Sequence, residues 1–152
     1  MPNSNGLLIV STARPCRALV VDDNAINRKI MHIILTEGGA QVSEAEDGLQ
    51  ACEAHAHEPF DIILMDIQMP VMDGHAAVRA IRAREEERGL ERTPIIMVSA
   101  FVAMKDIDES MRCGADLHLG KPVQVASLLA AVRDALDGWP SREDGKRAVY
   151  YP

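Results

Sequence analysis

The sequence predicts an α/β fold, a doubly wound parallel sheet of five strands with five helices covering its two faces. Three observations indicate this class. Short apolar runs rich in Val and Ile alternate with longer stretches of helical periodicity. The alternation repeats five times within residues 17–137. Glycine or proline follows most of the helical stretches, so each β/α unit has a visible end.

The five predicted strands are short and mostly apolar. They cover Ala18–Val21, Gln41–Ala45, Ile62–Met65, Ile95–Val98 and Leu117–Leu119. The predicted helices between and after them cover about residues 24–37, 49–57, 74–88, 105–113 and 125–136. In the first helix, one face carries Ile26, Ile30, Ile33 and Ile34. In the third, Glu85, Glu86 and Glu87 are predicted to be a solvated face.

The chain is predicted to hold one domain. Its 152 residues can bury a single core, and no internal repeat is visible. Residues 16–137 form the predicted domain, with an N-terminal extension at 1–15. Residues 138–152 are rich in Gly, Pro and charge and are predicted to be a C-terminal tail or linker.

Composition excludes several classes of function. A formal charge of −7 disfavours nucleic acid as a partner, because binding to phosphates relies on a basic surface. No apolar run approaches the roughly 20 residues that span a bilayer, so no membrane partner is expected. The three cysteines, Cys16, Cys52 and Cys113, form no metal-binding spacing and are expected to be reduced thiols. A soluble, cytoplasmic protein is therefore predicted.

Polar residues occur where four of the predicted strands end. Asp22 and Asp23 follow the first strand and Asp66 follows the third. Ser99 follows the fourth strand and Lys121 comes shortly after the fifth. Because the carboxyl ends of parallel strands share one edge of a sheet, these residues are expected to converge there.

Such a cluster has a definite chemistry. Close carboxylates repel one another unless a cation offsets their charge, and oxygen ligands suit Mg²⁺ or Mn²⁺. Asp66 is then a candidate nucleophile that forms an acyl phosphate. Lys121 would supply a second positive contact and Ser99 a hydroxyl donor to a phosphoryl oxygen.

Plainer interpretations stay open for each residue. Asp22 and Asp23 could cap the first helix, although one cap needs only one Asp. Asp66 could be an isolated strand-end carboxylate, Ser99 a turn residue and Lys121 an exposed cation. Two further sets favour the plain interpretation. Asp73-Gly74 fits a turn and helix cap, and His55 and His57 point to different faces of a helix.

Four stretches together resemble the receiver domains of response regulators, over about residues 17–137. They are Val20-Val21-Asp22-Asp23-Asn24, Leu64 to Gly74 (LMDIQMPVMDG), Ile96-Met97-Val98-Ser99-Ala100 and Lys121-Pro122. Each is weak alone, whereas four in order are specific. The run from Asp22 to Arg28 looks most like receivers of hybrid histidine kinases and phosphorelays.

The resemblance implies a flavodoxin-like strand order 2-1-3-4-5 and a phosphoacceptor role in a two-component system or phosphorelay. Asp66 would take a phosphoryl group from a phosphohistidine, with Ser99 and Lys121 assisting. Asp23 and Asp66 would ligate the metal directly, Asp22 through a metal-bound water and Gln68 through its backbone carbonyl. Lys121-Pro122 would be a cis peptide bond.

The same resemblance implies partners and exposes two departures from the family pattern. A histidine kinase or a histidine-phosphotransfer protein would be the donor, and a downstream protein would bind the face of helix 4, strand 5 and helix 5.

His118 stands where most relatives have Tyr or Phe as the switch residue, so the usual aromatic switch is in doubt. Phe101 flanks the phosphoryl site with Gln68 and predicts slow autodephosphorylation.

Two other functions are less consistent with the sequence. A phosphatase with an Asp nucleophile would carry a second acid where this chain has Gln68. A scaffold that needs no phosphorylation would have gaps in the acidic set, and none is seen. No output domain is recognised, and Met1 mildly favours a free-standing regulator over a piece of a hybrid kinase.

Overall fold

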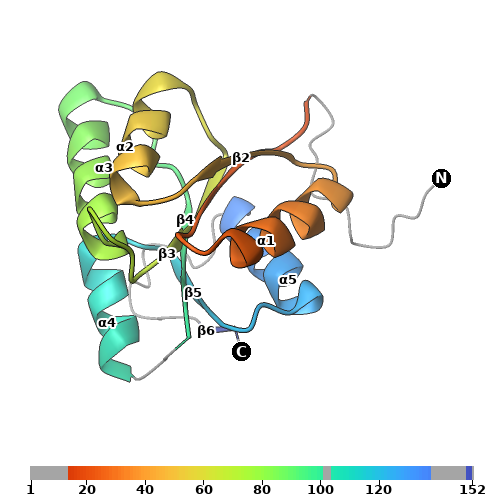
Figure 1. The fold of residues 1–152 in the computed structure, drawn as a ribbon. Helices are drawn as coiled ribbons and strands as arrows, with labels where there is room; N and C mark the ends of the chain where they lie inside the picture. The colour runs from red at the N-terminus through yellow and green to blue at the C-terminus, as the bar shows by residue number, and fades with distance from the viewer. Residues whose placement is uncertain (1–13, 101–103, 138–149, 152) are drawn as a thin grey trace.

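The computed structural model describes residues 14–100, 104–137 and 150–151 (Figure 1). Its parallel sheet has the strand order β2-β1-β3-β4-β5-β6. The strands are β1 Arg17–Val21, β2 Gln41–Ala45, β3 Ile62–Asp66, β4 Ile95–Ser99, β5 Leu117–Gly120 and β6 Tyr150–Tyr151. The first five confirm the predicted order. The sixth lies in the segment predicted to be only a tail or linker.

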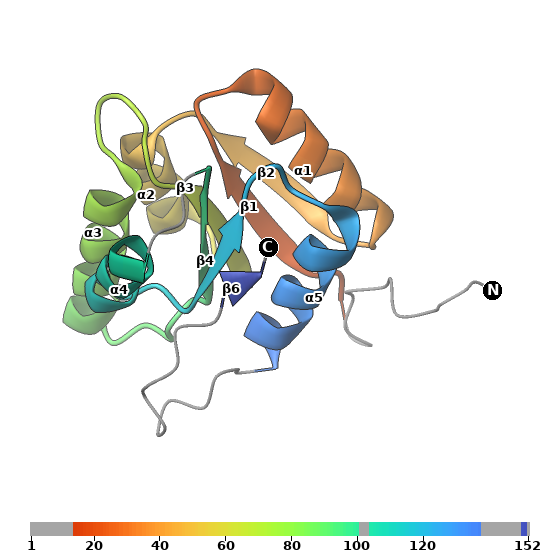
Figure 2. The same cartoon turned by 90° about the horizontal axis from the view of Figure 1, so that it is seen from below.

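Within the described residues, five helices cover the sheet, as predicted. They are α1 Ala25–Glu37, α2 Gly48–His57, α3 Gly74–Arg88, α4 Met104–Cys113 and α5 Val125–Leu136. α1 and α5 lie on one face, and α2, α3 and α4 lie on the other (Figures 1 and 2). In the described part of the chain, no helix combines the length and apolar character needed to cross a bilayer.

The core has two halves because alternate residues of a strand point to opposite faces of the sheet. On β3, Leu64 packs on the side of α1 and α5, whereas Ile63 and Met65 pack on the side of α2 and α3. All five residues of β3 are buried. Full burial of one such side chain stabilises the fold by about 1.5–3 kcal/mol, so this central strand is a rigid base for the Asp66 that ends it.

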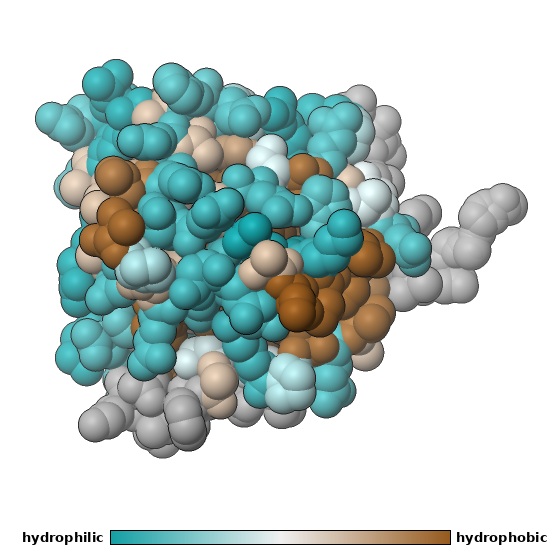
Figure 3. Space-filling view, viewed as in Figure 1, coloured by the Kyte–Doolittle hydropathy of each residue, from teal (hydrophilic) through white to brown (hydrophobic). Residues whose placement is uncertain are grey.

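The buried face of α1 differs from the isoleucine face noted in the sequence, of which Ile34 alone packs against the core. Met31 and Leu35 contact the core, while Ile26, Ile30 and Ile33 are 70%, 42% and 48% exposed. The helix carries two overlapping apolar stripes, and its docking angle decides which one is buried. Figure 3 shows apolar surface over α1 and α5, and the exposed isoleucines belong to α1.

Polar side chains cap the N-termini of two helices that begin next to strand ends. Asn24 caps α1 by accepting a hydrogen bond from the Asn27 amide, and Asp73 caps α3 through the Ala76 amide. The interpretation of Asp73 as a cap is thereby confirmed. At Gly74, a Cβ atom would lie 2.1 Å from the Asp66 carbonyl oxygen, so only glycine lets α3 begin directly against the end of β3.

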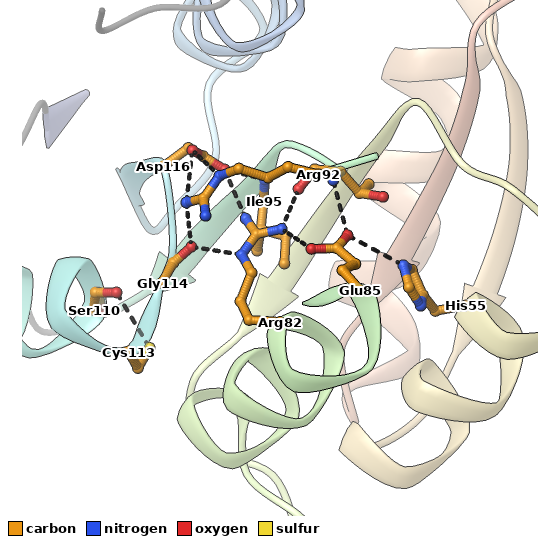
Figure 4. Close-up of polar contacts among 10 residues, drawn as sticks. His55, Arg82, Glu85, Arg92, Ile95, Ser110, Cys113, Gly114 and Asp116 are labelled. Carbon is orange, nitrogen blue, oxygen red and sulfur yellow. Dashed lines mark hydrogen bonds and ion pairs between the residues drawn. The ribbon is translucent and has the colours of Figure 1, made fainter. Parts of the chain in front are cut away.

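An ion-pair network ties the helices together at the amino end of the sheet (Figure 4). Glu85 accepts hydrogen bonds from Arg82 Nη1 and the Thr93 amide, both at 2.8 Å, and lies 3.3 Å from His55 Nε2. Arg82 also donates to Asp116 Oδ2 at 2.9 Å. The expectation that Glu85 is solvated is wrong, because its side chain is 5% exposed.

Candidate functional site

The polar residues picked out at the strand ends lie together at the carboxyl edge of the sheet. Asp66 is the last residue of β3 and Ser99 the last of β4. The Lys121 amide donates to the Ser99 carbonyl at 2.9 Å, which holds the end of β5 beside β4. Asp22 follows β1, whose residue Val21 pairs with Met65 of β3. Parallel pairing thus gathers residues that are up to about a hundred positions apart.

Three carboxylates meet at this edge. Asp22, Asp23 and Asp66 each offer an oxygen, and these oxygens all lie within 4.8 Å of one another. Asp22 is fully buried and Asp66 is 6% exposed, whereas Asp23 is exposed. Because Asn24 is the residue that caps α1, neither Asp22 nor Asp23 is needed for the cap. The capping alternative for the acidic pair does not hold.

Local hydrogen bonds fix the loop that carries the acidic pair. Asp22 Oδ1 accepts from the Asn24 amide at 2.9 Å, and the Asp22 carbonyl accepts from Arg28 Nη1 at 2.8 Å. Arg28 Nε also donates to Glu44 Oε1 of β2 at 3.0 Å. The sequence marked Arg28 only as part of the likeness to hybrid-kinase receivers, and its contact with the loop of the acidic pair was not predicted.

Lys121 provides the positive charge of the cluster. Its Nζ atom lies 3.0 Å from Asp22 Oδ2 and 3.3 Å from Asp66 Oδ1. Burial alone would lower the pKa of Lys121, but the two carboxylates outweigh it and raise that pKa above its usual value. The Lys121-Pro122 peptide bond is cis, as the resemblance implied.

The cluster holds more negative than positive charge, and this affects Asp66. Burial and the nearby Asp22 carboxylate raise the pKa of Asp66 to about 6, with Asp23 adding to the effect and Lys121 opposing it. A carboxylate in this setting is destabilised in its charged form. A cation or a proton would relieve the repulsion, so the site is suited to take up positive charge.

The donor set fits a hard divalent cation. All three candidate ligands are carboxylate oxygens, which Mg²⁺ and Mn²⁺ prefer over nitrogen or sulfur. Asp22 Oδ2 is buried and forms an ion pair with Lys121 Nζ. Among the described residues, it accepts no hydrogen bond that meets the geometric criteria. This oxygen can accept a further interaction from a metal-bound water. We therefore treat the edge as a candidate Mg²⁺ site.

The other predicted site residues lie in different places in the structure. Gln68 is exposed on the loop after β3, two residues beyond Asp66. His118 is fully buried on β5, level with Met97, on the opposite face of the sheet from Leu117 and Leu119. Phe101 lies outside the described residues.

Comparison with known proteins identifies the family. Residues 18–133 match the family model described as the response regulator receiver domain. The sensor protein GacS of Pseudomonas syringae pv. syringae is 38% identical over 121 residues, which are 80% of this chain and 13% of that protein. Hybrid signal transduction histidine kinase A of Dictyostelium discoideum is 36% identical over 124 residues, covering 81% and 6%. The chain thus spans a small part of these relatives, and the predicted likeness to hybrid-kinase receivers is confirmed.

Solved structures agree with this result. The receiver domain of the sensor histidine kinase PA1611 from Pseudomonas aeruginosa has a TM-score of 0.73 and 32% identity, covering 81% of this chain and 98% of that one. That structure has a magnesium ion coordinated in its active-site cleft. The chemotaxis protein CheY4 of Vibrio cholerae has a TM-score of 0.74 and 30% identity, covering 80% and 98%.

Proposed function

Because the chain belongs to the response regulator receiver domain family, we propose that Asp66 accepts a phosphoryl group from a phosphohistidine and thereby switches a partner-binding face. One observation carries this proposal. Asp66 ends the central strand between an acidic pair and Lys121, with a pKa raised to about 6. A structural carboxylate would be stabilised by its neighbours, whereas this one is poised to react or to bind a cation.

The proposed transfer uses the residues of the cluster in distinct roles. An Asp66 carboxylate oxygen attacks the phosphorus, the N–P bond of the donor breaks, and the donor imidazole leaves with the bonding electrons. Lys121 would bind one phosphoryl oxygen, and Ser99 would donate its hydroxyl to another. Asp22, Asp23, Asp66 and the Gln68 carbonyl are the proposed groups that would hold Mg²⁺. When bound, Mg²⁺ offsets negative charge on the phosphoryl group.

We assign the donor to the class of histidine kinases or histidine-phosphotransfer proteins, acting in the cytoplasm. The exposed isoleucines of α1 begin next to the loop that carries Asp22 and Asp23. Ile26, Ile30 and Ile33 therefore offer an apolar surface beside the reacting carboxylate. A protein that delivers phosphate to Asp66 would bury this surface as it docks.

The test of the function is phosphorylation by a small donor. Acetyl phosphate with Mg²⁺ is expected to add one phosphoryl group per chain, seen by intact mass, and Asp66→Asn should abolish the gain. Asp73→Asn is a matched control, because Asp73 caps α3 and offers no ligand to the cluster. Many turnovers of acetyl phosphate would favour an enzyme instead. A chain that stays unmodified would favour a scaffold and refute the proposal.

The docking surface has its own test. Ile30→Asp should slow transfer from a phosphorylated histidine-phosphotransfer protein at least about tenfold, since it buries a charge in an apolar contact. Phosphorylation by acetyl phosphate should not change. Leu90→Asp is a matched control, because Leu90 is 45% exposed and lies just after α3, at the amino end of the sheet. Equal slowing by both variants would contradict the α1 surface.

The lifetime of the phosphorylated form is a further part of the proposal. Gln68 and Phe101 follow Asp66 and Ser99 by two positions, and neither side chain can act as a general base toward water. Hydrolysis should therefore be slow. We also expect the imidazole of His118 to serve as the switch residue in place of the Tyr or Phe of most relatives. A lifetime of only seconds would contradict the first expectation, and unchanged partner binding in phosphorylated His118→Ala would contradict the second.

A further inference from the structure

The two edges of the core sheet differ in exposure. β2 forms one edge, and its residues Gln41 and Glu44 are exposed. β5 would form the other edge of a five-stranded sheet, yet all four of its residues are buried. The free edge of a strand presents unpaired N–H and C=O groups that attract another strand. Helices α4 and α5 contribute to the burial of β5 by packing against it, whereas its edge would stay open to another strand unless a further segment covers it.

The cover is a strand from the chain itself. Tyr150 pairs with His118 and Tyr151 pairs with Leu119, both in parallel register. β6 lies beside β5 at the end of the sheet and also contacts α5 (Figure 2). Residues 138–149 connect α5 and its C-cap to this strand. The backbone of β6 thus occupies the position that an added strand would take.

We propose that the β5 edge is a docking surface for an extended polypeptide segment and that Tyr150–Tyr151 occupies it in cis. Backbone hydrogen bonds would give such a segment its affinity, as in other cases of strand addition. The regulatory consequence rests on the proposed function. The edge lies within the face of α4, β5 and α5, so a downstream protein that adds a strand there must first displace β6.

The intramolecular strand is suited to be displaced. It offers β5 only two residues, and ordering them costs conformational entropy that offsets the few hydrogen bonds gained. Tethering gives it a high effective concentration, which keeps the edge covered when no competitor is present. A partner segment that pairs along all four residues of β5 would make more backbone hydrogen bonds than β6 does and would displace it. The cover therefore sets a threshold for partner binding rather than a permanent block.

The test removes the hydrogen-bonding capacity of β6 in the full chain. In the double variant Y150P/Y151P both residues lose their backbone N–H, whereas the control Y150F/Y151F keeps both. The first measurement is hydrogen exchange at the amides of residues 117–120. The outward-facing amides of β5 should exchange about tenfold faster in the proline variant than in the wild type and the control.

The second measurement is an NMR titration with a peptide of residues 146–152 (KRAVYYP). The proline variant should bind it at residues 117–120 at least about tenfold more tightly than the wild type and the control do. Equal β5 exchange in all three proteins, or equal peptide binding, would overturn the proposal. Neither measurement depends on phosphorylation. If acetyl phosphate failed to modify Asp66, the proposed function would fall while the strand-addition surface was still supported or refuted by these results.

Discussion

The sheet carries a charged cluster at each end, and the two are built on opposite principles. At the amino end, each charged group of the Arg82 network has a partner that offsets it. Arg82 donates to Glu85, Asp116 and the carbonyls of Thr93 and Gly114 (Figure 4). At the carboxyl end, three carboxylates share the single Lys121 among the described residues.

The pKa values report this difference. Burial would raise the pKa of Glu85, but hydrogen bonds from His55, Thr93 and Arg82 outweigh it and lower that pKa to about 2. Burial and Asp22 instead raise the pKa of Asp66 to about 6. The charged groups of the Arg82 network are paired with one another, so the network stabilises the fold and has little capacity to bind a further ion. The unsatisfied cluster costs stability, and it is the one that can take up a metal ion and a phosphoryl group.

Breaking the amino-end network should have the largest effect. Arg82→Leu leaves Glu85 and Asp116 buried without their main partner, which should lower the free energy of unfolding by about 3–5 kcal/mol. Urea denaturation at pH 7 measures the change. The control Arg79→Leu lies on the same helix with a 58% exposed side chain and should change stability by only about 0.5 kcal/mol. Similar losses in both variants would contradict a special role for Arg82.

The pH dependence of Glu85→Gln should be the next largest effect. Because the pKa of Glu85 is lower in the folded state than in the unfolded state, its charge stabilises the protein above about pH 4.5. That contribution, on the order of 2–3 kcal/mol, is lost as the pH falls toward 2. The stability difference between wild type and Glu85→Gln should thus stay constant above about pH 5 and shrink as the pH falls from about 4.5 toward 2. A constant difference would show that the charge is irrelevant.

Asp66→Asn should change the stability of the protein in the opposite direction to Glu85→Gln. The pKa of Asp66 is higher in the folded state, so the wild-type protein loses stability as the pH rises from about 4 to 6. In the presence of EDTA, Asp66→Asn should stabilise the protein by about 2–3 kcal/mol at pH 7.5 and by nothing near pH 4. Urea denaturation at the two pH values tests this. A destabilised Asp66→Asn protein at pH 7.5 would show that the acidic cluster is not strained.

Magnesium should have the smallest effect on stability. It should relieve the repulsion between carboxylates at the carboxyl end of the sheet and leave the amino-end network unchanged. Mg²⁺ at ten times its dissociation constant should stabilise the wild type by about 1.4 kcal/mol at pH 7.5. Asp23→Asn and Asp66→Asn should lose most of this gain, whereas Glu85→Gln should keep it. Thermal unfolding with and without Mg²⁺ measures the shift. Equal gains in all four proteins would place the ion elsewhere.

The exposure of single helix faces was less predictable than the fold. The sequence of α1 has apolar residues on two overlapping stripes, and no local rule decides between Met31 with Leu35 and the isoleucine face. Glu85 was predicted to be solvated because it stands in a run of three glutamates. Apart from Arg82 on the same helix, its partners lie on α2 and in the segment that leads into β4, and contacts of that kind leave no periodic signal.

The carboxyl-edge site, by contrast, was visible before the fold was known. Asp22, Asp66, Ser99 and Lys121 each follow an apolar run, and parallel strands must place such positions on one edge. The alternation of apolar runs and helical stretches likewise predicted five parallel strands, and the resemblance to receiver domains supplied their order in the sheet. These features depend on local patterns and on the geometry that all parallel sheets share.

Only the tertiary structure decided the energetics and the last strand. The raised pKa of Asp66 depends on burial and on Asp22 nearby, and the lowered pKa of Glu85 depends on donors from three segments. β6 is two residues long and has no periodicity, so its pairing with β5 exists only because the edge of the folded sheet offers unpaired backbone groups. Sequence patterns place residues on edges and faces, whereas packing decides which charges are satisfied and which edges are covered.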